Sequence, residues 1–325
     1  MSLPSIVIED VTKTYGHTVA LDGVRLKLEG TGVVGYLGPN GAGKTTTLKI
    51  LTTLIRPSRG RAIVNGIDVA ERPREALAGV GAVVETPAPP ETYTVRDSLE
   101  LVANLRGMGT ESIHDRIAYF AKVLELPPLD QSMGALSTGL RQRVVIAGAL
   151  LPDPPVVILD EPTNGLDPAE RVRIRDVVNG LKGDHLVLMS SHLLGEISET
   201  CDSVVFLKQG KVLLQESISR LQKASAPSSF EVVFADSVEE DKIAQLSRSQ
   251  LSISRTSARS FHIEIVESGV DGGRLLDGLR KAGSVLEFRP SASVLEQTYM
   301  RVMGEGRATG SNGTTNGDSD SPPKE

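Results

Sequence analysis

A glycine-rich segment that ends in lysine and threonine carries the clearest chemistry in the sequence. It follows an apolar run ending at Leu37, precedes a stretch with helical spacing, and fits the P-loop pattern G-x-x-x-x-G-K-[ST]. Its glycines let backbone N–H groups converge on phosphate oxygens, and the helix N-terminus adds partial positive charge. We expect Lys44 to neutralise the β- and γ-phosphates of ATP and the Thr45 hydroxyl to bind Mg²⁺. The predicted ATP contacts are Gly38, Pro39, Asn40, Gly41, Ala42, Gly43, Lys44, Thr45 and Thr46.

Two adjacent carboxylates, Asp160 and Glu161, end a second apolar run at residues 156–159. One carboxylate can hold the Mg²⁺ shell while its neighbour orients or deprotonates an attacking water. We therefore assign the metal role to Asp160 and the catalytic-base role to Glu161. Taken alone, the pair would also fit an exposed strand end with solvated acids. The P-loop upstream favours the catalytic interpretation.

A third motif, LSTGLRQR at residues 136–143, lies between these two elements and precedes an apolar helical run. Ser137 and Gly139 stand at the predicted helix start, where a hydroxyl, free N–H groups and the helix dipole form an anion site. An ordinary serine N-cap is the alternative. Because the P-loop already serves one phosphate, we expect this second site to serve the γ-phosphate of a partner subunit. A twofold dimer would then bury two ATP molecules.

A signature of this LSGGQ type, placed between a P-loop and an Asp-Glu strand, resembles the ABC ATPases. The whole stretch LSTGLRQRVVIAGALLPDPPVVILDEPTNGLDP is similar to that family, and the resemblance covers about residues 6–214. It implies ATP hydrolysis, with Tyr15 stacking on adenine, Asp167 at the dimer-contact loop and His192 contacting the γ-phosphate. A core role for Tyr15 and a helix-capping role for His192 are the alternatives. The ending SASVLEQTYMRVMG also looks like that of exporter ATPases.

Three positions depart from the family pattern. Glu85 stands where the family has a glutamine that reaches Mg²⁺ and the attacking water. A carboxylate can still ligate Mg²⁺, although it adds negative charge beside the γ-phosphate. Glutamate at this loop resembles the bacitracin- and daunorubicin-resistance type of exporter ATPase. Thr138 and Leu140 replace a glycine and a glutamine of the signature, while the phosphate-facing Ser137 and Gly139 remain.

The order of apolar runs and helix-like stretches predicts an α/β fold with a buried sheet. We expect a P-loop ABC ATPase domain over residues 1–215 with a helical subdomain at about 86–151, then a linker at 216–229. A small α+β domain at 230–304, with the strand and helix order of a split βαβ sandwich and its first helix at 238–247, and a disordered tail at 305–325 complete the chain. Thr94 is expected to cap a helix with Asp97. Strands are predicted at residues 6–9, 33–37, 80–84, 156–159, 186–189 and 204–207.

Composition limits the partners and the compartment. The net charge of -6 and the 3% aromatic content disfavour a nucleic-acid partner, which calls for a basic face and stacking rings. The single cysteine, Cys201, excludes an intrachain disulfide and suits a reducing compartment. The N-terminus does not resemble a signal peptide, and no apolar run approaches the ~20 residues that cross a bilayer. We therefore expect a peripheral protein on the cytoplasmic face of the membrane.

Together these features predict an ATP-hydrolysing subunit of an exporter. It would act as an ATP-sandwiched homodimer, or beside a similar subunit, beneath a separately encoded integral membrane permease. The helical insert and the Pro-rich loop at 86–93 would contact that permease. A soluble ABC ATPase acting on ribosomes or DNA is the alternative; such chains usually carry two ATPase domains, a coiled-coil insert or zinc ligands. A P-loop kinase would lack the signature and His192.

Overall fold

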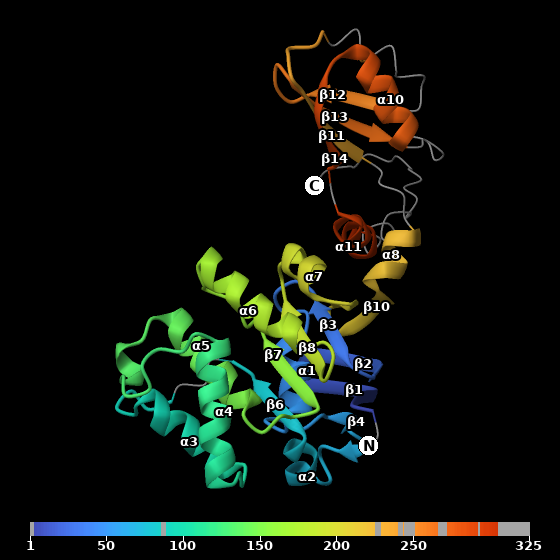
Figure 1. Cartoon of the computed structure of the whole chain (residues 1–325). Helices are drawn as coiled ribbons and strands as arrows, with labels where there is room; N and C mark the ends of the chain where they lie inside the picture. The colour runs from blue at the N-terminus through green and yellow to red at the C-terminus, as the bar shows by residue number, and fades with distance from the viewer. Residues whose placement is uncertain are drawn as a thin grey trace, which may run out of the picture. The chain divides into compact units, whose positions relative to one another are not determined.

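The protein is described by a computed structural model that covers residues 3–85, 89–224, 229–239, 243, 251–265, 272–291 and 293–304. The chain divides into two compact units, Met1–Pro227 and Ser228–Glu325. Figure 1 shows the elements of both.

A six-stranded sheet forms the centre of the first unit, in the order β10-β9-β3-β8-β7-β6. Its strands are β3 (Gly32–Leu37), β6 (Val80–Val83), β7 (Val156–Asp160), β8 (Leu186–Ser191), β9 (Ser203–Lys208) and β10 (Lys211–Ser217). The neighbours from β9 to β6 pair in parallel, and β10 adds an antiparallel edge. Every residue of β7 and β8 is buried, as expected for parallel strands covered on both faces. The five predicted strands of this sheet are confirmed.

A second, antiparallel sheet has the order β2-β1-β4-β5. It contains β1 (Ser5–Tyr15), β2 (Thr18–Glu29), β4 (Arg59–Val64) and β5 (Ile67–Asp68). Only the start of β1 was expected from the sequence. In β2 buried Leu26 and Leu28 alternate with exposed Arg25 and Lys27, which is the pattern of a sheet with one solvated face. Continuous apolar runs, on which the strand predictions rest, do not reveal that alternation.

Helices pack around these sheets. They are α1 (Lys44–Leu51), α2 (Pro73–Ala78), α3 (Val95–Leu105), α4 (Thr110–Val123), α5 (Thr138–Leu150), α6 (Pro168–Gly180), α7 (Leu194–Thr200) and α8 (Ile218–Ala224), with a 3₁₀ turn at Met133–Ala135. In Figure 1, α3, α4 and α5 lie together as a helical group beside the six-stranded sheet. The predicted cap is confirmed, since Asp97 N donates to Thr94 Oγ1 at 3.0 Å. None of the described helices is long and apolar enough to span a bilayer.

The segment placed in a linker at 216–229 is not irregular throughout. Residues up to 217 continue β10, and α8 follows directly. Ile218 and Leu221 of α8 are buried, and α8 contacts β9 and β10. Its polar composition suggested a loop, but two apolar side chains three positions apart give the helix a face to bury.

The second unit is a four-stranded antiparallel sheet with helices α10 (Gly272–Ala282) and α11 (Val294–Gly304). The strands β11 (Ser229–Phe234), β12 (Leu251–Arg255), β13 (Ser260–Ile265) and β14 (Val285–Pro290) have the order β12-β13-β11-β14. Strand β13 therefore lies between β11 and β12, as expected for a split βαβ unit. Leu275 and Leu279 of α10 join Phe230 and Phe261 in its core. The expected helix at 238–247 falls mostly outside the described residues, and the expected tail at 305–325 falls wholly outside them.

Candidate nucleotide-binding and hydrolysis site

The parallel strands explain how distant motifs meet. Strands β3, β8 and β7 are neighbours in that order, and the carboxyl ends of parallel strands lie at one edge of a sheet. The P-loop follows β3, His192 follows β8, and Asp160 is the last residue of β7. Glu85 lies just beyond β6, the next strand. Residues more than a hundred positions apart are thus delivered to the edge where α/β sheets bind ligands.

The P-loop glycines are required by close approach and by backbone conformation. A Cβ on Gly38 would lie 2.3 Å from the Leu207 carbonyl oxygen. Gly43, the N-cap of α1, has φ 107°, and its Cβ would lie 2.6 Å from a methyl carbon of Leu21. No other residue fits these two positions without displacing the backbone. Pro39 and Asn40 are exposed at the loop's tip.

The other predicted ligands of the P-loop segment lie in the first turn of α1 and just before it. Thr45 and Thr46 are partly exposed there, Ala42 is buried, and Gly41 has φ 78°. The first N–H groups of a helix have no partners within it, so this turn offers donors to an anion.

Three predicted catalytic side chains touch one another. Lys44, only 6% exposed, donates from Nζ to the Gly38 carbonyl oxygen at 2.8 Å and lies 3.4 Å from Glu161 Oε1. Glu161 Oε2 lies 2.8 Å from Nδ1 of His192. The carboxylate can only accept, so Nδ1 donates and Nε2 takes no part in this bond. Glu161 therefore bridges the lysine of the P-loop and the histidine that follows β8.

Glu161 has an unusual backbone conformation and a partner that sequence reasoning missed. Its φ is 45°, in the left-handed region that a glutamate seldom occupies. Its N–H donates to Ser190 Oγ at 2.9 Å, and that hydroxyl donates to Asp160 Oδ1 at 2.5 Å. Ser190 is fully buried in β8. The sequence feature that could have revealed Ser190 is a polar residue at the end of an apolar strand, two positions before His192.

The donors at this edge fit Mg²⁺. Thr45 and Asp160 offer hydroxyl and carboxylate oxygens, the ligands that this ion takes. Oδ1 of Asp160 accepts the Ser190 hydrogen bond, so Oδ2 keeps more of its lone pairs for a cation. No group of three or more His, Cys, Asp or Glu side chains able to hold a metal occurs among the described residues. The two oxygen ligands offered by Thr45 and Asp160 suit an ion that completes its coordination shell with phosphate oxygens and water.

Glu85 has a cationic partner in α1. Its carboxylate forms an ion pair with Lys49, one helical turn beyond Thr45. Hydrogen bonding to Glu85 is the main cause that raises the pKa of Lys49 above its usual value. Glu85 itself is exposed and has φ 61°. The ion pair offsets the extra negative charge at this loop; the metal role of Glu85 stays a prediction.

Tyr15 ends β1 with 48% of its surface exposed, so its ring is not a core side chain. The ammonium of Lys13 lies 5.0 Å from the centre of the ring. A half-exposed aromatic ring beside a cation suits the stacking of a base, and the adenine role stays a prediction.

The signature residues belong to a different part of the unit from the P-loop. Ser137 is the exposed N-cap of α5, and its Oγ accepts from Leu140 N at 3.3 Å. Helix α5 contacts α3, α4 and β6, whereas α1 contacts β2, β4 and β7. A Cβ on Gly139 would lie 2.8 Å from Cγ of Glu170, so a larger residue would displace the Glu170 side chain that packs against α5 here.

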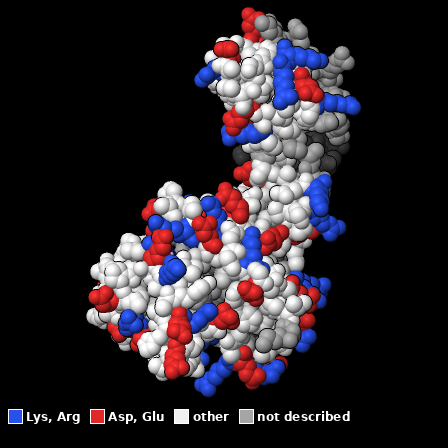
Figure 2. All heavy atoms as spheres, in the orientation of Figure 1, with Lys and Arg blue, Asp and Glu red and all other residues white. Residues whose placement is uncertain are grey.

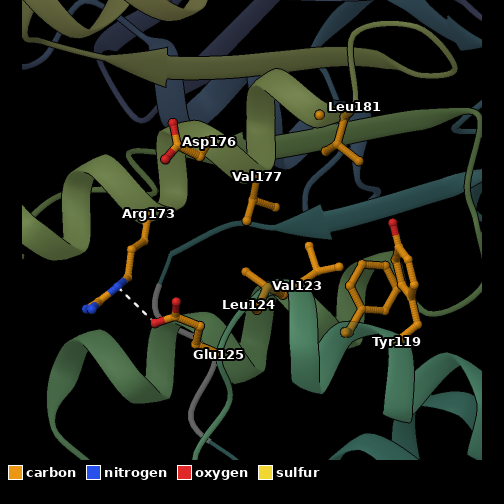
Figure 3. Close-up of a pocket in the computed structure, with 10 residues that line it drawn as sticks. Tyr119, Val123, Leu124, Glu125, Arg173, Asp176, Val177 and Leu181 are labelled. Carbon is orange, nitrogen blue, oxygen red and sulfur yellow. Dashed lines mark ion pairs between the residues drawn. The ribbon is translucent and has the colours of Figure 1, made fainter.

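Buried charges join the signature helix to α6. Arg143, one turn beyond Gly139, lies 3.1 Å from Glu170 and donates to the carbonyl oxygens of Leu124 and Glu125 at 2.9 and 2.7 Å. Glu170 also donates its N–H to Asp167, which caps α6. Figure 3 shows a nearby hollow between α4 and α6, with an ion pair between Arg173 and Glu125 at one side.

That hollow, of about 280 Å³, contains none of the predicted nucleotide-contacting residues. Its walls are apolar side chains of α4 and α6, with charges at the rim (Figure 3). We therefore assign the hydrolytic chemistry to the sheet edge.

Known proteins share these features. A family model described as ABC transporter matches residues 21–164. The chain is 36% identical to a daunorubicin resistance ATP-binding protein of Streptomyces coeruleorubidus, over 73% of this chain and 74% of that protein. It is 34% identical to the bacitracin transport ATP-binding protein of Bacillus licheniformis, over 66% and 70%. An uncharacterized ABC transporter ATP-binding protein of Bacillus subtilis (strain 168) is 29% identical over 91% of this chain and 98% of its own length.

Solved structures agree in fold. An ATP binding subunit of an ABC transporter superposes with a TM-score of 0.62 at 29% identity, over 67% of this chain and 92% of that one. A dimeric ATP-binding cassette in a post-hydrolysis state, bound to ADP and Pi, gives a TM-score of 0.60 at 27% identity, over 66% and 98%. This chain therefore belongs to the ABC transporter family, as an ATP-hydrolysing subunit related to the ATPases of drug exporters.

Proposed function

We propose that the protein powers an exporter by closing as a dimer around two ATP–Mg²⁺ and reopening after hydrolysis, on the cytoplasmic face of the membrane beneath a separate permease. The relatives that act in daunorubicin resistance and bacitracin transport support export as the direction. The cargo would be selected by the permease.

In this proposal each residue at the sheet edge has a defined task. Lys44 neutralises the phosphoryl oxygens on which charge accumulates during transfer. Glu161 orients or deprotonates the attacking water, and His192 holds Glu161 through Nδ1. Thr45 and Asp160 would hold Mg²⁺, which supplies further charge neutralisation at the phosphates.

The observation that carries the dimer is the separation of the two anion sites. The exposed Ser137 and the P-loop stand on helices that pack against different elements of the same unit. The Ser137 bond to Leu140 N is long, at 3.3 Å, so the hydroxyl can turn to a phosphate at small cost. The signature of one subunit would then contact the γ-phosphate bound at the P-loop of the other.

Size-exclusion chromatography of Glu161→Gln tests the proposal. This variant keeps shape and ATP binding but slows hydrolysis by about 10²–10⁴-fold, so ATP persists and holds the dimer together. We expect a shift from monomer to dimer when ATP and Mg²⁺ are added. Adding Ser137→Arg should abolish that shift.

Ser293→Arg is the matched control, because Ser293 is also an exposed N-cap whose Oγ accepts from a backbone N–H, here of Glu296 at 3.1 Å. It stands in the second unit and should leave the ATP-dependent dimer intact. A Glu161→Gln protein that stays monomeric at every ATP concentration while hydrolysing near the wild-type rate would refute both the dimer and the role of Glu161.

An apolar groove supports a membrane-protein partner. A cavity of about 360 Å³ lies between α3, α5 and β6, and its walls include Tyr93, Leu101, Val102, Val144 and Val145. Leu101 is 42% exposed, and Tyr93 is 38% exposed. Its lining includes Ala82, three residues before Glu85, and Pro89, four residues after it, so a segment bound there would lie close to Glu85 in the chain.

Co-expression with its permease tests that partner. The chain should sediment with membranes when the permease is present and remain in the supernatant when it is absent. A distribution between membrane and supernatant that is the same with and without the permease would favour the soluble alternative.

Surface charge bears on that alternative. On the face drawn in Figure 2, acidic and basic side chains are interspersed over each unit. Together with the net charge of -6, this mixed surface offers little attraction to a nucleic acid.

A further inference from the structure

We propose that Ser190 is a positioning residue for ATP hydrolysis, whose buried hydroxyl fixes both acidic residues at the end of β7. The inference rests on the proposed roles of Asp160 and Glu161 and adds a buried residue behind them. It acts through the Asp160 carboxylate and the Glu161 backbone N–H.

The hydrogen bonds match what one hydroxyl can provide. A serine hydroxyl has one donor and two acceptor positions. Ser190 donates to Asp160 Oδ1 at 2.5 Å and accepts from Glu161 N at 2.9 Å. Because Ser190 has no exposed surface, water from the surface is poorly placed to replace either bond if the hydroxyl is removed.

The conformation of Glu161 explains why such a bond is needed. At φ 45° a non-glycine residue is in a disfavoured region, and it persists there only when its surroundings hold it. In this backbone conformation the Glu161 side chain contacts both Lys44 and His192. The N–H bond to Ser190 holds the residue at the position where the chain leaves the sheet.

The second bond restrains the predicted metal ligand. Asp160 is 9% exposed and receives the Ser190 hydroxyl on Oδ1. Fixing that oxygen sets the rotation of the carboxylate and so the direction of Oδ2. One side chain therefore places the ligand of Mg²⁺ and the base in a fixed relation to each other.

Removing the hydroxyl should affect the chemical step rather than ATP binding, since Lys44 and the P-loop backbone are untouched. A displacement of a catalytic group by about 1 Å can cost about 10²-fold in rate. We expect Ser190→Ala to lower kcat by about 10- to 100-fold. KM for ATP should stay within about threefold, and the Mg²⁺ concentration for half-maximal rate should rise, because Asp160 is no longer oriented.

The decisive measurement is a double-mutant comparison of kcat and KM in the full chain. If Ser190 acts through Glu161, then at saturating Mg²⁺, where the loss through Asp160 is compensated, Ser190→Ala should add less than about twofold to the loss already caused by Glu161→Gln. The matched control is Ser98→Ala, which deletes another buried serine hydroxyl, bonded to the Thr94 carbonyl oxygen at 3.0 Å in α3. Its basal ATPase rate should equal that of the wild type.

Thermal melting and ATP binding accompany each assay. A folded Ser190→Ala with kcat within twofold of the wild type would overturn the inference, as would an equal further loss in the Glu161→Gln background at saturating Mg²⁺. If Ser190→Ala does not fold, Ser190→Cys keeps the volume with a weak donor and should show the same fall in kcat; a wild-type rate would overturn the inference. Should Glu161→Gln itself hydrolyse normally, the proposed function fails, whatever Ser190 does.

Discussion

Replacing Arg143 by methionine should destabilise the first unit more than a typical surface change would. Arg143 is 5% exposed, pairs with Glu170 at 3.1 Å, and donates to two backbone carbonyl oxygens at the end of α4. Methionine retains much of the aliphatic stem and removes all of these bonds. Breaking one side of a buried pair costs about 3–5 kcal/mol, because the remaining charge loses its partner.

The structure places the expected loss at the lower end of that range. Glu170 keeps a second partner, since Arg173 donates to its Oε1 at 2.9 Å. We therefore expect about 3 kcal/mol. For a unit of this size the melting temperature should fall by about 6–12 °C. Urea denaturation followed by circular dichroism measures the change in the free energy of unfolding directly.

Two further variants make the result specific. Arg141→Met removes a single bond of 3.3 Å to the Met133 carbonyl oxygen from the same helix and should cost less than about 1 kcal/mol. Combining Arg143→Met with Glu170→Met should cost less than the sum of the two single changes, because no unpaired buried charge is left. A loss below about 1 kcal/mol for Arg143→Met, or strict additivity with Glu170→Met, would refute the reasoning.

Four other outcomes can be checked with standard assays. Lys44→Ala should abolish ATP hydrolysis, and a rate within twofold of the wild type would remove the P-loop assignment. Glu85→Gln should keep or raise the rate, since it removes a negative charge near the γ-phosphate and releases the Lys49 ammonium from its ion pair; a collapse in a coupled ATPase assay would show that the carboxylate is required. Hydrogen bonds from Thr94 hold the pKa of Asp97 below its usual value. Stability from this group is thus present above the unfolded-state pKa and lost as pH falls through the folded-state pKa; Asp97→Asn should therefore flatten the acidic side of a plot of melting temperature against pH. Burial raises the pKa of the Cys201 thiol, so a thiol reagent at pH 8 should label it only in urea, and rapid labelling of the native protein would contradict its buried position.

Local patterns determined much of this protein. The P-loop glycines, the Thr94 cap and the apolar strands were readable because backbone freedom, capping and burial depend on neighbours in sequence. The same patterns missed β2, where alternation replaced a continuous run, and α8, where a polar composition hid two buried side chains.

Tertiary structure alone decided which side chains meet at the sheet edge. Ser190 lies beside Asp160 because β7 and β8 pair in parallel with those two residues opposite each other. Lys49 meets Glu85, and Arg143 meets Glu170, across elements far apart in the chain. Periodicity shows which face of an element is buried, but strand register and helix packing choose the partner. The residue types that can do chemistry were therefore visible in the sequence, whereas the contacts that orient them arise only when the strands come together.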